Sequence, residues 1–300
     1  MIKAQMSTPL DVLAHPIVLS APKRLVWSAW NGHIPFGMLL VELLAPRLLV
    51  ELGTHSGASY CAFCQAISEL GLKTKAVAVD TWLGDEHSGV YGNDVLADLR
   101  KHHDSLYGSF STLLQCTFDE AALIFQPDSI DLLHIDGLHT YEAVRHDFET
   151  WVPKMSNRGV ILFHDTAVTQ SGFGVRQFWA ETKSRYPYFE MFHSSGLGIL
   201  IVGEQARVLL GSILECSDGD KSVIRQLFEE LGSRLELRVE KERLNESLHA
   251  QRDISERMER ELVDFYKLAH NPLVRLARGA QRYGTIGVFR EGARRLTTAK

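Results

Sequence analysis

One stretch, residues 129–166, constrains the fold more than any other part of this 300-residue sequence. Two short apolar runs, at residues 130–135 and 159–163, have the composition of buried parallel strands. An amphipathic segment, residues 141–155, separates the runs and has the pattern of a helical crossover. Strand, helix and strand make a βαβ unit. The sequence therefore predicts an α/β fold with a mostly parallel, doubly wound sheet.

Each strand of this unit is followed by an acid. Asp136 closes the first strand, and His164 and Asp165 close the second. Ligands of open α/β sheets bind at the carboxyl ends of the strands. Neighbouring strands lie about 4.8 Å apart, so both carboxylates would reach a single cation. Two unpaired carboxylates at that spacing repel each other, and a bound metal would keep both charged. We therefore place the functional centre at Asp136 and Asp165.

A second ligand-binding pattern lies earlier in the chain. The apolar run 47–52 reads as a buried strand, and a helix is expected from Ala58 to about Leu70. Between them stands the glycine loop, which consists of Gly53, Thr54, His55, Ser56 and Gly57. Glycines allow a tight turn and a close backbone approach, and the following helix offers free N–H groups to a carboxylate or phosphate. Strand, glycine loop and helix form a nucleotide-cradling arrangement.

The strand expected at residues 74–79 ends at Asp80, which is placed to accept hydrogen bonds from ribose hydroxyls. Residues 81–93 are rich in Gly, aromatic and charged residues, and we interpret them as a lid. A helix to about Tyr107, a strand at 110–115 and a short helix capped by Thr117 or Asp119 follow. After the central unit come a helix at 172–185 and two closing strands, at 189–193 and 197–202. A seven-stranded sheet finished by an antiparallel hairpin is the expected outline.

Composition restricts the class of protein. The hydrophobic fraction of 45% supports a large core. No apolar stretch approaches the roughly 20 residues of a membrane span, and the N-terminus lacks the pattern of a secretory signal, so we expect a cytoplasmic protein. Cys61 and Cys64 form a CxxC inside a predicted helix without a second pair to complete a zinc site. The net charge is −5, and the residues from Lys267 onward contribute +7, so the first 266 residues carry −12, which argues against nucleic acid as a main substrate.

Four motifs in order, each at a predicted strand end, resemble those of class I S-adenosylmethionine-dependent methyltransferases. They begin at Glu51, Asp80, Asp136 and His164 and read ELGTHSG, DTWLGD, DGLHTY and HDT. More narrowly, residues 30–205 resemble the macrocin O-methyltransferase-like and glycosyltransferase-associated branch, which includes metal-dependent sugar O-methyltransferases. The resemblance implies a Rossmann-like fold, S-adenosyl-L-methionine as cofactor and a divalent metal, Mg²⁺ being the expected ion.

The resemblance also implies roles for single residues. The glycine loop would surround the methionine end of the cofactor, and Asp80 would bind the ribose. The metal would be held by Asp136 and Asp165, with His164 available beside them, although relatives often have a carboxylate at that place and Mg²⁺ prefers oxygen. The full set of cofactor contacts expected from the resemblance is Glu51, Gly53, Thr54, His55, Ser56, Gly57, Asp80, Thr81, Trp82, Thr117, Phe118 and Asp136.

The chemistry of methyl transfer to a sugar hydroxyl suits these residues. A neutral hydroxyl is a poor nucleophile, and a cation chelated by two vicinal oxygens would lower its pKa. A base must then take the proton, and an imidazole has an unperturbed pKa of about 6.5. His139, three residues beyond Asp136, is our candidate for that base. Asp85 and His87 read as solvated loop residues, His146 and Asp147 as structural, and His102 and His103 as a solvated helix face.

The chain divides, on this reading, into four parts. Residues 1–46 would be a helical cap and 47–205 the methyltransferase domain, followed by a charged helical region at 206–271 and a basic tail at 272–300. Apolar residues, interrupted by Gln251, recur every seven positions within 237–265, so either a weak coiled coil that makes a homo-oligomer or a solvated helix fits. From Lys267 onward the chain has eight Lys or Arg and one acid, Glu291. Such a tail could contact the inner face of a membrane, which would suit a lipid-linked glycan acceptor.

Two other functions stay open at this point. Two acids and two histidines could supply a two-His-one-carboxylate set, which would make the protein a non-haem iron oxygenase. A cofactor loop with Asp80 argues against that alternative. The third reading is a non-catalytic scaffold, in which a methyltransferase-like domain serves the helix and the tail.

Overall fold

The structure, a computed structural model, describes residues 10–85, 89–270, 272–274, 278 and 281. The chain forms two compact units, residues 1–240 and 241–300. The first unit contains a three-layer α/β domain, and each unit is described by itself.

A seven-stranded sheet forms the middle layer of the domain, in the order β5-β2-β1-β6-β7-β9-β8. The first five strands of that order run parallel, whereas β9 pairs antiparallel with both β7 and β8. This confirms the predicted Rossmann-like sheet with its closing hairpin. The strands are β1 (Leu48–Leu52), β2 (Lys75–Asp80), β5 (Ser111–Gln115), β6 (Ile130–Ile135), β7 (Met155–His164), β8 (Tyr188–Met191) and β9 (Leu197–Ile201).

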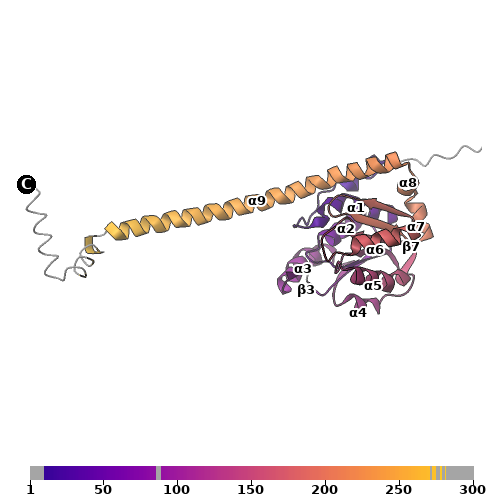
Figure 1. Cartoon of the computed structure of the whole chain (residues 1–300), viewed down its shortest axis with the longest axis horizontal. Coiled ribbons are helices and arrows are strands. Elements are labelled where there is room, and N and C mark those ends of the chain that lie inside the picture. The colour runs from indigo at the N-terminus through magenta and orange to yellow at the C-terminus, as the bar shows by residue number, and fades with distance from the viewer. Residues whose placement is uncertain (1–9, 86–88, 271, 275–277, 279–280, 282–300) are drawn as a thin grey trace, which may run out of the picture. The chain divides into compact units, whose positions relative to one another are not determined.

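Helices cover both faces of the sheet, and two hydrophobic clusters fill the space between the layers. One face packs against α1 (Ile34–Leu44), α2 (Ala58–Glu69), α3 (Asn93–Tyr107), α7 (Glu204–Leu209), α8 (Gly211–Leu214) and the start of α9 (Asp218–His270). The other packs against α4 (Phe118–Ala122), α5 (Tyr141–Trp151) and α6 (Val175–Thr182). In Figure 1, α4 and α5 lie on the opposite side of the sheet from α1. The side chains of alternate residues along a strand point to opposite faces of the sheet, so each strand contributes side chains to two separate hydrophobic cores.

Local sequence signals explain where the short helices begin. Thr117 caps α4 through a capping box, because its hydroxyl accepts from the N–H of Glu120 while the Glu120 carboxylate accepts from the N–H of Thr117. Thr140 caps α5 by accepting from the N–H of Ala143. Thr117 lies two residues beyond the end of β5 and Thr140 lies five beyond the end of β6, so both caps fix the chain soon after it leaves the sheet.

Several predicted boundaries differ from the observed ones. The strand expected at residues 159–163 begins earlier, at Met155, and its pairing with β6 contains a register shift between Ile130 and Leu132. The crossover helix ends at Trp151 and continues as a 3₁₀ turn, Val152–Lys154. The expected lid contains a two-stranded hairpin, β3 (Gly84–Asp85) with β4 (Gly89–Val90); His87 lies outside the described residues.

Residues 10–46 contribute side chains to the core, among them Ile17, Trp30 and Phe36. Three 3₁₀ helices, Val12–Ala14, Pro16–Leu19 and Ala29–His33, lead into α1. Nine of the eleven residues of α1 are buried, so this helix is enclosed by the domain. A helix that is apolar nearly all round requires neighbours on every side.

The chain returns to the same core after the sheet is complete. Ile213, Ile224 and Phe228 are buried in the cluster that contains α1, and the ring centroids of Phe228 and Phe36 lie 5.0 Å apart. A Cβ on Gly232 would stand 2.0 Å from the carbonyl oxygen of Gly32, so glycine is needed for this approach. The predicted domain boundary at residue 205 therefore falls inside the first compact unit, which extends to residue 240.

The second unit contains the rest of α9. Its large apolar side chains within residues 244–268 are exposed by about half or more: Leu244, Leu248, Ile254, Met258, Leu262, Val263, Phe265, Tyr266 and Leu268. Pro272 does not end helical structure, because residues 272–274 are again helical. Most of the predicted basic tail lies outside the described residues. Among the described helices, none combines the length and the apolar character that crossing a bilayer requires.

Candidate functional site

A cavity of about 940 Å³ opens at the carboxyl ends of the parallel strands. This is the edge where sequence reasoning placed the ligand. Twelve of the fifteen predicted site residues line it: Gly53, Thr54, His55, Ser56, Asp80, Thr81, Thr117, Phe118, Asp136, His139, His164 and Asp165. Residues from the N-terminal segment and from α4, α5 and the segment after β7 complete the wall, among them Trp27, Asp119, Asp147 and Phe173.

Asp80 holds the glycine loop in place. One carboxylate oxygen accepts from the backbone N–H groups of Thr54 and His55, both at 2.8 Å, and the other accepts from the N–H of Trp82 at 2.7 Å. Asp80, the predicted ribose contact, thus also joins the end of β2 to the loop after β1 through hydrogen bonds. A carboxylate has about four acceptor positions, so one remains for a ligand hydroxyl.

The helix that follows the glycine loop, α2, has no side-chain cap. Ala58 and Ser59 in its first turn line the cavity, and their N–H groups belong to the uncapped helix end. The positive end of the helix dipole favours a negative ligand group there. This wall of the cavity suits a carboxylate or phosphate, as the sequence predicts.

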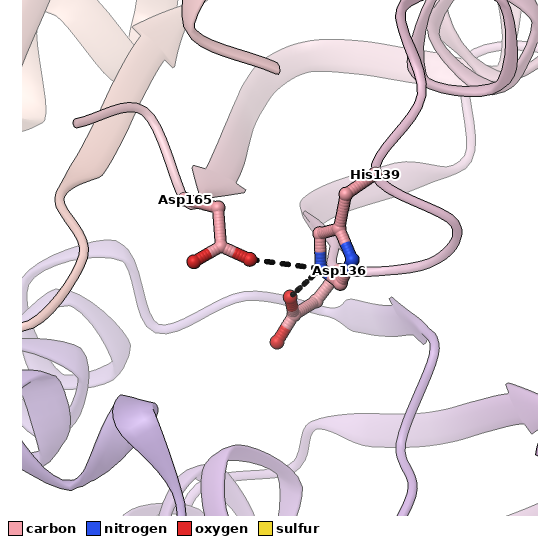
Figure 2. Close-up of side chains that lie close together, drawn as sticks. All are labelled: Asp136, His139 and Asp165. Atoms are coloured by element: carbon pink, nitrogen blue, oxygen red, sulfur yellow. Dashed lines mark hydrogen bonds and ion pairs between the residues drawn. The ribbon is translucent and has the colours of Figure 1, made fainter. Parts of the chain in front are cut away.

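Three ligand-type side chains converge at the centre of the cavity. One potential ligand atom each from Asp136, His139 and Asp165 lies within 4.8 Å of the other two. Figure 2 shows the imidazole of His139 between the two carboxylates. Its Nε2 atom is 2.8 Å from Asp165 Oδ2 and 3.4 Å from Asp136 Oδ1. The adjacency of β6 and β7 brings the two acids together, as predicted from the βαβ unit.

The electrostatics of this cluster favour positive charge. Burial acts to lower the pKa of His139, but its hydrogen bonds to the carboxylates of Asp136 and Asp165, together with their negative charge, outweigh burial and raise this pKa to about 9. Burial acts to raise the pKa of Asp165, whereas the imidazoles of His139 and His164 lower it to about 2. The pKa of Asp136 is lowered for the same reason. At neutral pH, a protonated imidazole therefore stands between two carboxylates.

His164 lies beside the cluster without joining it. Its Nδ1 atom is 3.3 Å from Asp136 Oδ1 and 3.5 Å from Asp165 Oδ1. Its Nε2 atom donates to the carbonyl oxygen of Ser194 at 3.2 Å, which fixes the ring so that Nδ1 faces the acids. The predicted metal set was Asp136, His164 and Asp165, whereas the structure groups His139 with the two acids.

The pKa shift of His139 makes stability depend on pH. Its folded pKa of about 9 exceeds the unfolded value of about 6.5, so its contribution is complete below pH 6.5 and is lost as the pH rises through 9. In EDTA, we expect the free energy of unfolding to fall by about 3 kcal/mol over this window. His139→Asn should flatten that part of the profile. Urea denaturation at pH 6 to 10 measures both curves, and parallel curves would contradict the assignment.

Three predicted residues lie away from the cavity wall. Trp82 is fully buried and its indole N–H donates to the carbonyl oxygen of His55. Gly57 has a φ of +79° at the turn into α2. Glu51 is fully buried; its carboxylate accepts from Nδ1 of His134 at 2.8 Å, and His134 Nε2 accepts from the indole N–H of Trp30 at 3.1 Å. Glu51 therefore lies in the core beneath the site, and its contact with the cofactor stays a prediction.

Trp27 belongs to the segment expected to form a cap; it is 70% exposed and stands at the cavity edge. Sequence reasoning missed other parts of the wall. Phe173 lines the cavity and stacks on His139 with ring centroids 4.9 Å apart. His146 pairs with Asp119 at 2.8 Å, and both line the cavity. Asp147, which the sequence pattern indicated as a structural residue, also lines the cavity. The signal for Asp147 was present: it occupies the buried face of α5, where an acid is unusual.

The comparisons with known proteins agree with this fold. Residues 50–166 match a family described as a methyltransferase domain. An uncharacterized protein, y4gI, of Sinorhizobium fredii is 50% identical over 178 residues, which are 59% of this chain and 20% of that protein. The present chain thus spans about a fifth of the length of the curated relative it matches.

Two solved structures illustrate the structural similarity. They are the methyltransferase PaMTH1 of Podospora anserina, solved with SAH, and the O-methyltransferase TomG of Streptomyces achromogenes, solved with SAM. Each is 14% identical, with a TM-score of 0.45 over 66% of this chain and 90% or 92% of its own. Residues 50–166 thus resemble a methyltransferase domain, and they lie within the Rossmann-like sheet described above.

Proposed function

We propose that this domain transfers the methyl group of S-adenosylmethionine to a hydroxyl of a sugar or glycan, with a divalent metal held by Asp136 and Asp165. The observation that carries the proposal is the convergence of these acids and His139 in one cavity with the glycine loop and Asp80. Such a cavity can place a nucleotide-like cofactor beside a polar reaction centre.

The residues present fit a cation. Two carboxylates of lowered pKa face one point, and the proton on His139 now supplies the positive charge there. Carboxylate oxygens suit Mg²⁺, and the adjacent imidazole also suits Mn²⁺ or Fe²⁺. When bound, such a metal supplies Lewis acidity that lowers the pKa of an acceptor hydroxyl.

His139 is proposed as the general base. With a pKa of about 9, His139 is protonated at neutral pH, so it can act as a base only after it has lost this proton. Positive charge held by Asp136 and Asp165 in its place would lower this pKa and free the Nε2 lone pair. The stacked ring of Phe173 keeps the imidazole in its plane over the acids. The same geometry would let His139 serve as a ligand instead.

The acceptor end of the cavity is assigned to the side that carries Trp27. Its exposed indole offers a large apolar face and an N–H donor at the cavity edge. Val168 and Gln170, after β7, line the cavity near the acids. A mixed apolar and polar wall of this kind suits a sugar ring.

Calorimetric titration with S-adenosylhomocysteine, with and without Mg²⁺ or Mn²⁺, tests the proposal. We expect a dissociation constant in the micromolar range, about −8 kcal/mol, because the cavity is preformed. Sugar and glycan acceptors are then screened by formation of S-adenosylhomocysteine from S-adenosylmethionine. Lack of binding under all conditions would contradict the methyltransferase reading. Tight Fe²⁺ binding without cofactor binding would instead favour the oxygenase.

A further inference from the structure

The hairpin turn between β8 and β9 has a backbone conformation that its sequence does not favour. The N–H of Gly196 donates to the carbonyl oxygen of His193 at 2.8 Å, and the two central residues, Ser194 and Ser195, have φ angles of +49° and +70°. A tight turn with positive φ at both central positions usually takes Asn and Gly there. Serine residues are strained in this conformation, and they keep it only where their surroundings hold them.

The main chain of this turn binds the segment that carries Asp165. The carbonyl oxygen of Ser194 accepts from Nε2 of His164 at 3.2 Å. The carbonyl oxygen of Ser195 accepts from the N–H of Ala167 at 2.8 Å. Asp165 lies between these two attachment points and has a φ of +61°, so its own backbone is strained as well. The direction of the Asp165 carboxylate therefore depends on where the turn lies.

The side chain of Ser194 contacts α9. Its hydroxyl donates to Oε1 of Glu236 at 2.5 Å, and both residues are partly buried. A Cβ on Gly32 would stand 1.9 Å from this hydroxyl oxygen and 2.9 Å from Glu236 Oε1, so little space remains around the pair. Gly232, one helical turn before Glu236, makes the close approach to Gly32 described above. A hydrogen bond to a carboxylate is stronger than one to a neutral acceptor, so α9 holds the turn at Ser194.

We propose that Glu236 is a positioning residue of the cation site: through the Ser194 hydroxyl it holds the turn that fixes Asp165. The inference rests on the proposed function, because that function places a divalent cation at Asp136 and Asp165. Glu236 lies outside the cavity wall, so it acts without touching a ligand. Outer hydrogen bonds that orient metal ligands raise the affinity for the metal. The part of α9 that belongs to the first compact unit thus supports the site.

Titration of the full chain with Mn²⁺ tests the inference. Glu236→Ala and Ser194→Ala should each weaken Mn²⁺ binding about 10-fold, as expected for a residue that orients a metal ligand. Glu236→Gln keeps an acceptor oxygen, so its Mn²⁺ affinity should stay within about 3-fold of the wild type. In EDTA, S-adenosylhomocysteine should bind all three variants as it binds the wild type. Glu230→Ala, at an exposed position of the same helix, should match the wild type with both ligands.

A double variant shows whether the two side chains act through one bond. Glu236→Ala combined with Ser194→Ala should lose about 10-fold in Mn²⁺ affinity and not about 100-fold, because both substitutions break the same hydrogen bond. Additive losses in the double variant would overturn the inference. Wild-type Mn²⁺ affinity in Glu236→Ala, or an equal loss of affinity for S-adenosylhomocysteine, would overturn it as well.

A measurement without metal separates the inference from the proposed function. Amide hydrogen exchange at Ala167, whose N–H donates to Ser195, should become about 10-fold faster in Glu236→Ala, while exchange at Ile161 within β7 stays unchanged. If the wild type binds no Mn²⁺ but Ala167 responds in this way, the metal part of the proposed function fails and the positioning role stands. Unchanged exchange at Ala167 overturns the positioning role whether or not Mn²⁺ binds.

Discussion

Replacing Gly53 with Ala is expected to lower the free energy of unfolding by about 3 kcal/mol or more and to abolish binding at the cavity. Gly53 has a φ of +85°, which costs an L-residue about 1–2 kcal/mol. A Cβ there would also stand 2.0 Å from the carbonyl oxygen of Asp136 and 2.6 Å from its carbon. These are backbone atoms at the end of a central strand, so they cannot move away without displacing the site.

Gly71→Ala is the matched control for that experiment. Gly71 also has a positive φ, +63°, but a Cβ there would meet nothing within 4 Å. It should therefore show only the conformational cost, about 1 kcal/mol. Urea denaturation of both variants measures the difference. Equal losses of stability would mean that the contact between the glycine loop and Asp136 is not tight.

Asp165→Asn is expected to weaken binding of Mn²⁺ at least about 100-fold and to reduce methyl transfer in proportion. The substitution keeps the shape of the side chain but removes a charge from the cluster with Asp136 and His139. A cation then loses one of its two anionic ligands, and the remaining carboxylate can be neutralised by His139 alone. Calorimetric or electron paramagnetic resonance titration with Mn²⁺ measures the affinity directly, and a methyl-transfer assay measures the second effect.

Asp253→Asn controls for the loss of one negative charge, because Asp253 is exposed on α9. Its Mn²⁺ affinity should match that of the wild type. Wild-type affinity in Asp165→Asn would show that the two acids serve to hold the imidazolium of His139 and that the metal part of the proposed function is wrong.

The fold was predictable because its signals are local and repeated. The six residues Ile130–Ile135 were predicted as a strand with the observed bounds, since all six are buried between two layers and form one continuous run with a single acid. The start of β7 was missed because Asn157 and Arg158 interrupt the apolar pattern in the first half of the strand. The hydrophobic pattern of a sequence identifies buried residues, and this part of β7 is only partly buried.

The site was harder to predict than the fold, since strand ends can be read from sequence but contacts across the sheet cannot. Asp136 and Asp165 were placed correctly at adjacent strand ends. Glu51 precedes the glycine loop in the same way, yet it pairs in register with His134 and points into the core. His139 was expected near the acids, but its position between them depends on the path of the loop before Thr140. No local pattern encodes that path.

The return of the chain to its first layer bears on how the protein is made. The last strand of the sheet ends at Ile201, but the apolar face of α1 is covered only when Ile224 and Phe228 arrive. Phe36 and Phe228 are almost two hundred positions apart in the chain, and contacts of such long sequence separation form slowly. During synthesis, the apolar surface of Phe36 and its neighbours therefore stays exposed, and can bind chaperones or aggregate, until the first turns of α9 have left the ribosome.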